Sequence, residues 1–355
     1  MNEISSNNHS VFFNEAGYPY LAQLLTPAAY SKLFILVDTN TYTHCLPSFL
    51  AQLATDVPFE IIEFEAGESN KNLETCMHIW QAMTELNGDR KSAVINLGGG
   101  VVTDLGGFIA STFKRGIDYI NVPTTLLAMV DASVGGKNGI DLGHLKNQIG
   151  TITNPKAVFI NTQFLETLPQ LEMRSGLAEM LKHGLILDRD YWNQFKDLSQ
   201  LTTDDLDLLI YKSVVLKNNV VTEDQTETGI RKALNFGHTL GHAIESHCMI
   251  SEHLPTLLHG EAVAIGMLLE SYISLEMNLL TIEEYTEIKN VLLGMYEFPE
   301  FTADDIQNIT DLLIYDKKNE FGIIQFCLLN GIGDVKINQQ VDNKLIFKAF
   351  KDYKK

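Results

Sequence analysis

The sequence predicts an α/β domain built on a parallel sheet, followed by a mostly α-helical domain. In the first half of the 355 residues, short β-branched runs alternate with helix-like segments, a pattern typical of Rossmann-like parallel sheets. After Leu168-Pro169, long amphipathic segments replace these runs. We therefore expect an α/β domain over residues 1–167 and a helical domain over residues 168–355.

Each element has its own signal in the sequence. Short apolar runs predict strands at residues 33–37, 59–64, 93–97, 118–122 and 157–161. Helical periodicity predicts helices at roughly 171–186, 189–197, 203–222, 231–247, 258–278 and 282–295. Thr281 and Glu284 form a capping box before the last of these helices. Residues 322–328 and 333–338 bracket Asn330-Gly331 and predict a β-hairpin.

Composition limits the class of protein. The net charge of -19 argues against nucleic-acid binding, because phosphates require a basic surface. No apolar run is long enough to span a membrane and the start lacks signal-peptide features, so we expect a cytoplasmic protein that binds no membrane. The cysteines are scattered and are expected to be reduced: Cys45, Cys76, Cys248 and Cys327.

The segment from Arg231 to Glu245 contains the most informative pattern. Arg231, Asn235, His238, His242 and Glu245 follow one another at spacings of 4, 3, 4 and 3 residues, which on a helix places them on one face. A polar helix face usually contains Lys and Glu. Two imidazoles in line with an amide and a guanidinium are costly unless something binds there. We therefore predict a ligand or metal site rather than a merely polar stripe.

A glycine-rich turn follows the predicted strand at 93–97. The triple glycine ending at Gly100 precedes a predicted helix, and backbone N–H groups at such a helix start can bind phosphate. Thr103 stands at the third glycine position of the G-x-G-x-x-G fingerprint, so the generic motif is not present. A tight turn without a ligand is the alternative. Asp104 could orient the loop or a ribose, or cap the helix.

Polar groups also accumulate after the next predicted strand. Thr124 and Thr125 follow it directly, and a second glycine turn leads into Lys137. Ligands of open α/β sheets bind at the carboxyl ends of strands, where these groups fall. Several basic residues lie beside Gly, Asn or His and predict a pocket for a small, multiply charged anion: Arg115, Lys137, Lys146, Lys182, Lys217 and Arg231.

Four side chains are candidate metal ligands: Glu179, His238, His242 and His259. A catalytic zinc site has three protein ligands and an open position, and residue chemistry leaves open which three of the four bind. Lys182 shares a helix face with Glu179 and could contact a metal-bound substrate or pair with the carboxylate. Three further histidines are expected to be surface or hydrogen-bonded residues: His183, His247 and His253.

Taken together, these motifs resemble the 3-dehydroquinate synthase family. The matching segments are GGGVVTDLGGF, RGIDYINVPTTLLAMVDASVGGK, LKNQIG, RSGLAEMLKHGLI, KNNVVTEDQTETGIRKALNFGHTLGHAIE and LHGEAVAIGM. They follow the family order over residues 98–267. The resemblance implies a homodimeric lyase of the shikimate pathway that requires NAD and zinc or cobalt. Such an enzyme converts 3-deoxy-D-arabino-heptulosonate 7-phosphate into 3-dehydroquinate and phosphate.

The resemblance also implies a role for each matching residue. It makes Glu179, His238 and His259 the metal ligands and assigns His242 to the substrate side. The implied NAD-site residues are Asp38, Glu68, Lys71, Gly99, Gly100, Val101, Asp104, Thr124, Thr125, Asp131, Lys146, Thr167 and Leu168. The implied substrate residues are Asp131, Lys137, Lys146, Asn147, Lys182, Lys217, Arg231, Asn235, His242 and Lys317, with Arg115 reaching across the dimer.

The implied mechanism is a transient oxidation by NAD, followed by β-elimination of phosphate, re-reduction, ring opening and intramolecular aldol closure. The phosphate would be held by Arg115, Lys137, Asn147 and Lys317. Lys217 and Arg231 are the expected partners of the substrate carboxylate. Either His242 or the phosphate of the substrate could transfer the proton. Glu245 receives no role and is interpreted as a structural or solvated carboxylate.

Three alternatives are considered. Sibling sugar-phosphate cyclases form inosose or valiolone rings from substrates without a carboxylate, and the pair Arg231 and Asn235 favours the dehydroquinate branch. A metal-dependent polyol dehydrogenase also uses NAD and metal-binding histidines, but it would accumulate NADH. The chain could also be a catalytically silent NAD-binding module, which the complete set of metal and anion residues argues against.

Overall fold

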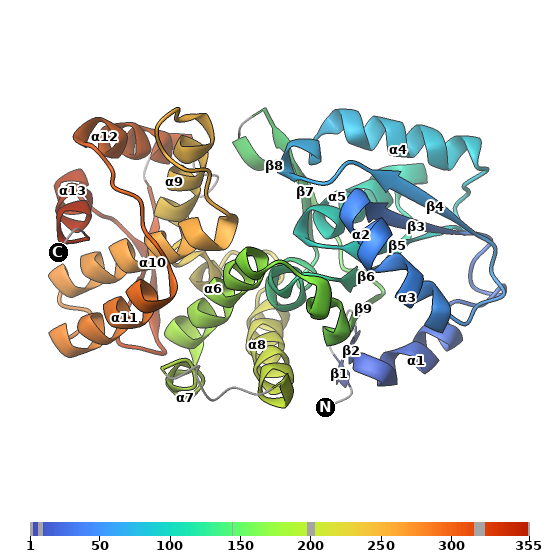
Figure 1. Cartoon of the computed structure of the whole chain (residues 1–355), viewed down its shortest axis with the longest axis horizontal. Coiled ribbons are helices and arrows are strands. Elements are labelled where there is room, and N and C mark those ends of the chain that lie inside the picture. Colours follow the sequence, from blue (N-terminus) through green and yellow to red (C-terminus); the bar gives the residue numbers. More distant parts are fainter. Residues whose placement is uncertain (1–2, 6–9, 144, 197–202, 316–323, 354–355) are drawn as a thin grey trace. The chain divides into compact units, whose positions relative to one another are not determined.

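The computed structural model describes residues 3–5, 10–143, 145–196, 203–315 and 324–353. The chain separates into two compact units, Met1–Pro169 and Gln170–Lys355. The first unit contains a mostly parallel sheet with helices packed on it, and the second is mostly helical (Figure 1). This confirms the predicted fold class.

The first unit is organised around a seven-stranded sheet in the order β1-β2-β9-β6-β5-β3-β4. Its strands are β1 (Glu3–Ser5), β2 (Ser10–Phe13), β3 (Leu33–Asp38), β4 (Phe59–Phe64), β5 (Ala93–Gly98), β6 (Asp118–Pro123) and β9 (Ala157–Ile160). All neighbours pair in parallel except β1, which is antiparallel to β2. The five predicted strands agree with the structure to within one residue at each end.

Helices cover both faces of this sheet. They are α1 (Gly17–Leu24), α2 (Thr39–His44), α3 (Leu46–Gln52), α4 (Leu73–Glu85) and α5 (Gly100–Thr112). Ile79 of α4 and Leu105 of α5 pack with Phe34 of β3 in one buried cluster. On the opposite face, Tyr18 of α1 contacts Phe159 of β9 edge-on, with ring centroids 4.6 Å apart. Because the central strands are buried on both faces, they are continuous apolar runs in the sequence.

The strand order reverses next to β3. The chain leaves β3 for β4 on one side and then returns to β5 on the other side. Such a reversal opens a crevice at the carboxyl ends of the two strands, where open α/β sheets bind ligands. Asp38 is the last residue of β3 and Gly98 the last of β5, so both lie at this edge.

A two-stranded hairpin, β7 (Lys137–Leu142) and β8 (Leu145–Ile152), extends from the first unit and was not predicted. Its segments are rich in Gly, Asn and Lys, residue types that are depleted in strands. The hairpin packs against α5 and contains Lys137, Lys146 and Asn147. It therefore supplies three of the expected site residues from one regular element.

The second unit is organised around one buried helix. Its helices are α6 (Gln170–Leu187), α7 (Arg189–Asn193), α8 (Thr203–Glu223), α9 (His238–Ile250), α10 (His259–Glu276), α11 (Ile282–Met295), α12 (Ala303–Leu312) and α13 (Asn343–Asp352). Residues of α10 are buried along nearly its whole length, as expected of a core helix that is apolar all round. It packs against α6, α9, α11 and α13.

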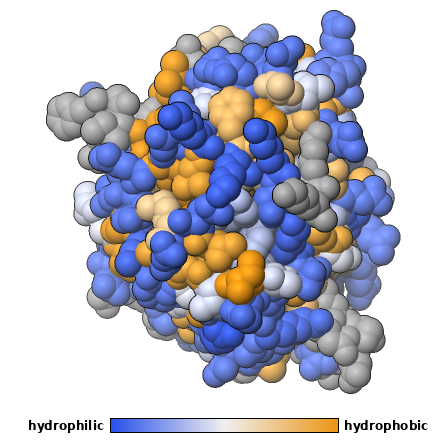
Figure 2. All heavy atoms as spheres, turned by 90° about the vertical axis from the view of Figure 1, so that its left-hand side faces the viewer, coloured by the Kyte–Doolittle hydropathy of each residue, from blue (hydrophilic) through white to orange (hydrophobic). Residues whose placement is uncertain are grey.

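The surface helices of this unit are amphipathic. In α13, Ile346 and Phe350 are buried while Lys344 and Lys351 are exposed. On the face of the second unit shown in Figure 2, hydrophilic side chains predominate and hydrophobic ones lie between them. Within the residues described, no helix combines the length and the apolar character needed to cross a membrane.

Most predicted elements of the second unit are present. Helices α6, α8, α10 and α11 lie where expected, and Thr281 and Glu284 form the capping box before α11. Helix α7 is shorter than predicted and ends at Asn193. The strands β10 (Phe326–Leu329) and β11 (Val335–Gln339) form the expected antiparallel hairpin, although residues 322–323 of the prediction lie outside the described residues.

One predicted helix is wrong. Instead of a continuous helix over 231–247, the structure has a 3-10 helix, η7 (Ile230–Asn235), and α9 begins only at His238. Gly237 separates the two with a left-handed backbone at φ 78°, which interrupts helical geometry and favours glycine. The five polar residues from Arg231 to Glu245 therefore do not share one helix face.

Candidate functional site

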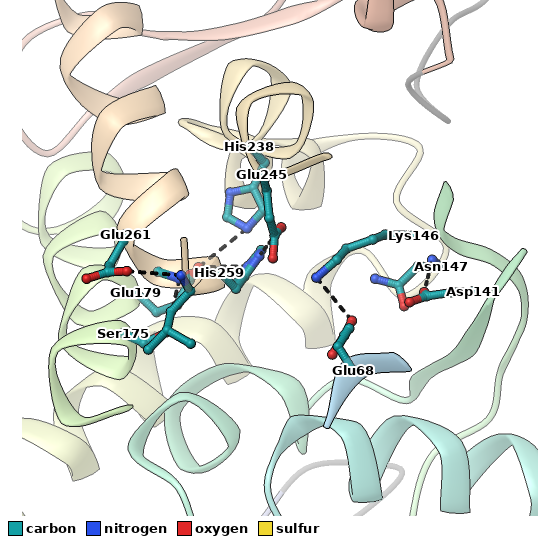
Figure 3. A network of polar contacts seen from close by, with 12 residues as sticks. Glu68, Asp141, Lys146, Asn147, Ser175, Glu179, His238, Glu245, His259 and Glu261 are labelled. Atoms are coloured by element: carbon teal, nitrogen blue, oxygen red, sulfur yellow. Dashed lines mark hydrogen bonds and ion pairs between the residues drawn. The ribbon is translucent and has the colours of Figure 1, made fainter. Parts of the chain in front are cut away.

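Three helix segments of the second unit bring the metal candidates together. Glu179 lies in α6, and His238 and His259 are the first residues of α9 and α10. Glu179 Oε1 lies 3.4 Å from His238 Nε2 and 3.7 Å from His259 Nε2 (Figure 3). Metal–ligand bonds of about 2.0–2.1 Å at tetrahedral angles place ligand atoms about 3.3–3.5 Å apart. The spacing of these three atoms therefore fits a single ion of zinc size.

Two glycines allow the helices to approach closely. A Cβ atom at Gly260, next to His259, would lie 2.0 Å from the backbone oxygen of Ser175 in α6. A Cβ atom at Gly266 would lie 1.9 Å from the backbone oxygen of Gly237, which precedes α9. Any larger residue would push α10 away from its neighbours. The two glycines of LHGEAVAIGM thus set the separation of the candidate ligands.

The two histidine rings are held through their Nδ1 atoms. His238 Nδ1 lies 3.1 Å from the backbone oxygen of Phe236, and His259 Nδ1 lies 3.2 Å from Glu245 Oε2. These contacts direct both Nε2 atoms toward Glu179. Metal-binding histidines usually engage their second nitrogen in this way, because the contact fixes the tautomer and the ring orientation.

Glu179 is fully buried, with 0% of its surface exposed. Among the described residues, neither carboxylate oxygen has a hydrogen-bond partner, although Lys182 Nζ makes an ion-pair contact with Oε2. A buried carboxylate whose oxygens accept no hydrogen bond is costly unless a cation compensates it. The second role considered for Lys182, pairing with Glu179, is thus the one observed, and the donor set fits a divalent metal.

His242 belongs to the same cluster. Its ring centroid lies 5.2 Å from that of His238 and 5.5 Å from that of His259. One nitrogen from each of the three rings lies within 4.8 Å of the others. All four candidates from the sequence are therefore brought together. His238 and His259 both direct their Nε2 atoms to the same oxygen, Glu179 Oε1, at 3.4 Å and 3.7 Å.

The start of α9 is anchored by a residue that the sequence analysis missed. Glu270 of α10 is fully buried, and its Oε2 accepts a hydrogen bond from Gly237 N at 2.6 Å. Its Oε1 accepts one from Leu240 N at 3.2 Å. These two backbone groups flank His238, so Glu270 holds the turn that presents this histidine. Glu270 lies 30 residues after Leu240 and on another helix, so no local sequence pattern indicates this contact.

Glu245 is a structural carboxylate, which is the first of the two alternatives expected for it. The side chain is not solvated, because only 3% of the residue is exposed, and it contacts His259. The spacing from His238 and His242 on the same helix was a signal for this position.

Three of the expected substrate-binding residues of this unit lie on two elements. Lys217 in α8, and Arg231 and Asn235 in η7, are all at most 7% exposed. Two acidic residues just before η7 arrange this segment and were not predicted. Asp224 Oδ2 accepts from Arg231 N at 3.0 Å, and Glu227 Oε1 accepts from Asn235 Nδ2 at 2.8 Å.

The remaining residues considered in the second unit are Lys317 and three further histidines. Lys317 lies outside the described residues. His183 hydrogen-bonds to Ser213 with its Nδ1 at 2.7 Å, and His247 and His253 both contact Asp305. All three histidines are thus hydrogen-bonded, as expected. His183 also lies near Glu179, because one of its ring nitrogens is within 4.8 Å of a carboxylate oxygen of Glu179.

In the first unit, the glycine turn lies at the carboxyl end of β5. Gly99 precedes α5, and no side chain caps the first turn of this helix, so its N–H groups point to a position where phosphate could bind. The next strand adds Thr124, whose N–H donates to Gly98 O at 3.0 Å, and Thr125, whose Oγ1 accepts from Ala128 N at 3.2 Å. The expected edge residues of β5 and β6 therefore lie together.

A charged network extends this edge toward the β7–β8 hairpin. Lys71 Nζ donates to Asp104 Oδ2 and to Asn147 Oδ1, both at 2.6 Å. Lys146 Nζ lies 3.1 Å from Glu68 Oε1 (Figure 3). Burial alone would lower the pKa of Lys71, but the nearby carboxylates of Asp104 and Glu68 outweigh it and hold the pKa above its usual value. Lys71 is thus a permanent cation that ties the hairpin to α5.

One of the alternatives for Asp104, capping the helix, is excluded by its position. The residue lies in the second turn of α5, which starts at Gly100, so it does not cap the helix. Asp38 does act as a cap, since its Oδ1 accepts from Thr41 N at 2.8 Å at the start of α2.

The other expected residues of this unit occupy separate elements. They are Val101 in the first turn of α5, Asp131 in the π-helical turn η4 (Ala128–Ala132), Lys137 at the start of β7, Arg115 at the end of η3 (Phe113–Arg115), and Thr167 and Leu168 at the end of η5 (Thr162–Thr167). Arg115 is exposed, with a left-handed backbone at φ 73°. In the described part of the chain, no hydrogen bond joins Thr167 or Leu168 to the glycine turn.

Comparison with solved structures reveals similar folds of known activity. The 2-epi-5-epi-valiolone synthase of Streptomyces hygroscopicus subsp. jinggangensis, solved with NAD+ and Zn²⁺, is 27% identical with a TM-score of 0.82. The match covers 100% of this chain and 99% of that one. A 2-deoxy-scyllo-inosose synthase, solved with carbaglucose-6-phosphate, NAD+ and Co²⁺, is 25% identical with a TM-score of 0.82, and 99% of each chain is covered.

Sequence comparison identifies the family of the chain. The model of the 3-dehydroquinate synthase N-terminal domain matches residues 61–175, and that of the C-terminal domain matches residues 176–319. A 3-dehydroquinate synthase of Parabacteroides distasonis is 42% identical over 340 residues, which cover 94% of each protein. On this similarity, the chain belongs to the 3-dehydroquinate synthase family.

Proposed function

We propose that the chain converts 3-deoxy-D-arabino-heptulosonate 7-phosphate into 3-dehydroquinate and phosphate, as a carbon–oxygen lyase. Family membership over nearly the whole chain supports the reaction. The observation that carries the chemistry is the convergence of Glu179, His238 and His259, in which a buried carboxylate faces two oriented imidazoles.

Two cofactors are part of the proposal. Glu179, His238 and His259 would hold Zn²⁺ or Co²⁺, the metals present in the two similar structures. The carboxyl edge of β3, β5 and β6 would hold NAD, with the pyrophosphate at the uncapped start of α5. When bound, NAD would supply reversible hydride transfer and the metal would polarise the reacting oxygen of the substrate. In these terms, residues 1–167 form the NAD-binding domain and residues 168–355 the metal- and substrate-binding domain.

The protein residues would bind and orient a doubly anionic substrate. Lys217 and Arg231 are buried cations that would pair with the carboxylate, with Asn235 beside them. Arg115, Lys137, Asn147 and Lys317 would hold the phosphate. His242 lies beside both proposed ligand histidines and is positioned to accept or return a proton.

A second candidate function is that of a sibling sugar-phosphate cyclase. The full-length similarity to the valiolone and inosose synthases favours it. The substrates of these enzymes lack the carboxylate that Arg231 is expected to bind. The two functions therefore differ in a measurable property, the requirement for a carboxylate on the substrate.

One experiment separates the possibilities. The purified protein is incubated with NAD, Zn²⁺ and either the heptulosonate phosphate or a hexose or heptulose phosphate that lacks the carboxylate. We expect phosphate release and 3-dehydroquinate from the first substrate only. Turnover of the second substrate alone would identify a sibling cyclase. Net NADH formation from polyols would identify a dehydrogenase.

We further propose that the protein is a cytoplasmic homodimer. Its four cysteines are all free and buried, which fits a reducing compartment. The exposed Arg115 is available to reach the site of a second subunit. Light scattering on the purified protein tests the dimer directly, and a monomer that is fully active would refute it.

A further inference from the structure

We propose that Glu245 is a positioning residue of the metal centre, which holds the ring of His259 and thereby strengthens metal binding. This inference rests on the metal site of the proposed function. Glu245 itself would bind neither the metal nor the substrate. Its effect would act through one ligand only.

The geometry around His259 supports this role. His259 is the first residue of α10, and 25% of its side chain is exposed, compared with 10% for His238. Glu245 belongs to the adjacent α9, and only 4% of its side chain is exposed. Its Oε2 lies 3.2 Å from His259 Nδ1, while His259 Nε2 lies 3.7 Å from Glu179 Oε1 (Figure 3). The ring is thus held between two carboxylates.

Glu245 contacts the second nitrogen of this ring rather than the one that faces Glu179. Its oxygen contacts Nδ1, which lies across the imidazole from the atom that faces Glu179. A carboxylate in this position orients the ring, fixes the proton on Nδ1 and raises the basicity of Nε2. It acts on the metal through the histidine.

The two histidines differ in their supports. His238 Nδ1 faces the neutral backbone oxygen of Phe236, whereas His259 Nδ1 faces a carboxylate. The ring of His238 is also more enclosed, with 10% of its side chain exposed. Of these two Nδ1 contacts, only the one to His259 is made by a side chain, so substituting Glu245 removes it. The backbone support of His238 cannot be removed by substitution.

Three variants test the proposal. Glu245→Ala removes the contact, and Glu245→Gln keeps an oxygen that can accept from Nδ1 but removes the charge. Glu252→Gln is the matched control, because Glu252 is an exposed glutamate in the segment that joins α9 to α10. Affinities for Zn²⁺ and Co²⁺ are measured on the metal-free proteins by competition with a chelator. The visible spectrum of bound Co²⁺ and the thermal midpoint of the metal-free proteins are recorded in parallel.

We expect Glu245→Ala to weaken metal binding about 10- to 100-fold, as substitutions around ligand histidines typically do. Glu245→Gln should lie between this variant and the wild type, and the control should match the wild type. The Co²⁺ spectrum should change in the Ala variant because the ring is reoriented. If the Ala variant does not fold, the order of wild type, Gln variant and control still tests the proposal.

Two negative results have different meanings. Wild-type protein that binds no metal would refute the metal site of the proposed function. Wild-type protein that binds metal, with both Glu245 variants binding it equally well, would refute only the role of Glu245. A lower thermal midpoint with unchanged metal affinity and spectrum would likewise show that Glu245 is merely structural.

Discussion

Replacing Glu270 by Gln removes one of the two oxygens that hold the first turn of α9. In the wild type, Glu270 accepts from Gly237 N and from Leu240 N, and both contacts lie at the positive end of the α9 dipole. In the variant, the amide group places an N–H donor against one of these backbone donors. The turn that presents His238 then loses a contact and gains a repulsion.

The expected cost follows from the contacts. A hydrogen bond to a charged group contributes about 1.5–3 kcal/mol. A carboxylate near a helix start adds about 0.3–1 kcal/mol, and up to about 2 kcal/mol when it is partly buried. Losing one such bond and the charge together should lower the free energy of unfolding of the second unit by about 2–5 kcal/mol. For a unit of this size, the thermal midpoint should fall by roughly 5–15 °C.

The assay is thermal and urea unfolding of metal-free protein, followed by titration with Zn²⁺. Glu276→Gln on the same helix is the control, since Glu276 forms a surface ion pair with Lys348, and such pairs contribute little to stability. We expect Glu270→Gln to be less stable and to bind Zn²⁺ more weakly, whereas the control changes neither. If Glu270→Gln unfolds like the wild type, to within about 0.5 kcal/mol, the reasoning on the α9 start is refuted.

Three further predictions concern single side chains. His238→Ala should abolish metal binding and activity while leaving NAD affinity unchanged, as measured by metal analysis and NAD titration; retained metal stoichiometry would overturn the ligand assignment. Arg231→Ala should weaken substrate binding about 10- to 100-fold through loss of a charged hydrogen bond, with NAD binding preserved, and equal losses would refute its role. Burial alone would raise the pKa of Asp305, but hydrogen bonds, mainly from Thr302 and His247, hold it well below its usual value. Its stabilising effect should be complete above the unfolded-state pKa of about 3.9 and be lost as the pH falls below it. Asp305→Asn should therefore show a flatter dependence of unfolding free energy on pH below about 4, and an unchanged slope would contradict this.

The sequence was most informative where local signals decide the structure. The strands β3, β5 and β9 are buried on both faces, so their ends could be placed to within one residue. The capping box of Thr281 and Glu284 marked the start of α11 correctly. The grouping of His238, His242 and His259 near Glu179 was also visible, because these residue types are rarely grouped without a purpose.

Tertiary contacts explain what could not be predicted. The spacing from Arg231 to Glu245 fits a continuous helix, but Gly237 adopts a left-handed backbone and is held by Glu270 on α10. The spacing places Glu245 on the same helix as His238 and His242, but its partner His259 belongs to another helix, so the contact itself could not be predicted. Such partners depend on how α9 and α10 pack, which periodicity does not encode.

The hairpin β7–β8 was missed for a related reason. Its strands are polar and glycine-rich, and they are stabilised by pairing with each other and by packing on α5. Lys71 then ties Asn147 of this hairpin to Asp104 of α5. Intrinsic strand propensity was outweighed by these contacts.

The most direct test of the account is the stoichiometry of the reaction. Purified protein with Zn²⁺ and a catalytic amount of NAD is given 3-deoxy-D-arabino-heptulosonate 7-phosphate, and phosphate, 3-dehydroquinate and NADH are measured together. The account predicts one phosphate and one 3-dehydroquinate for each substrate consumed, with no net NADH. Accumulation of NADH in proportion to substrate, without phosphate release, would contradict it.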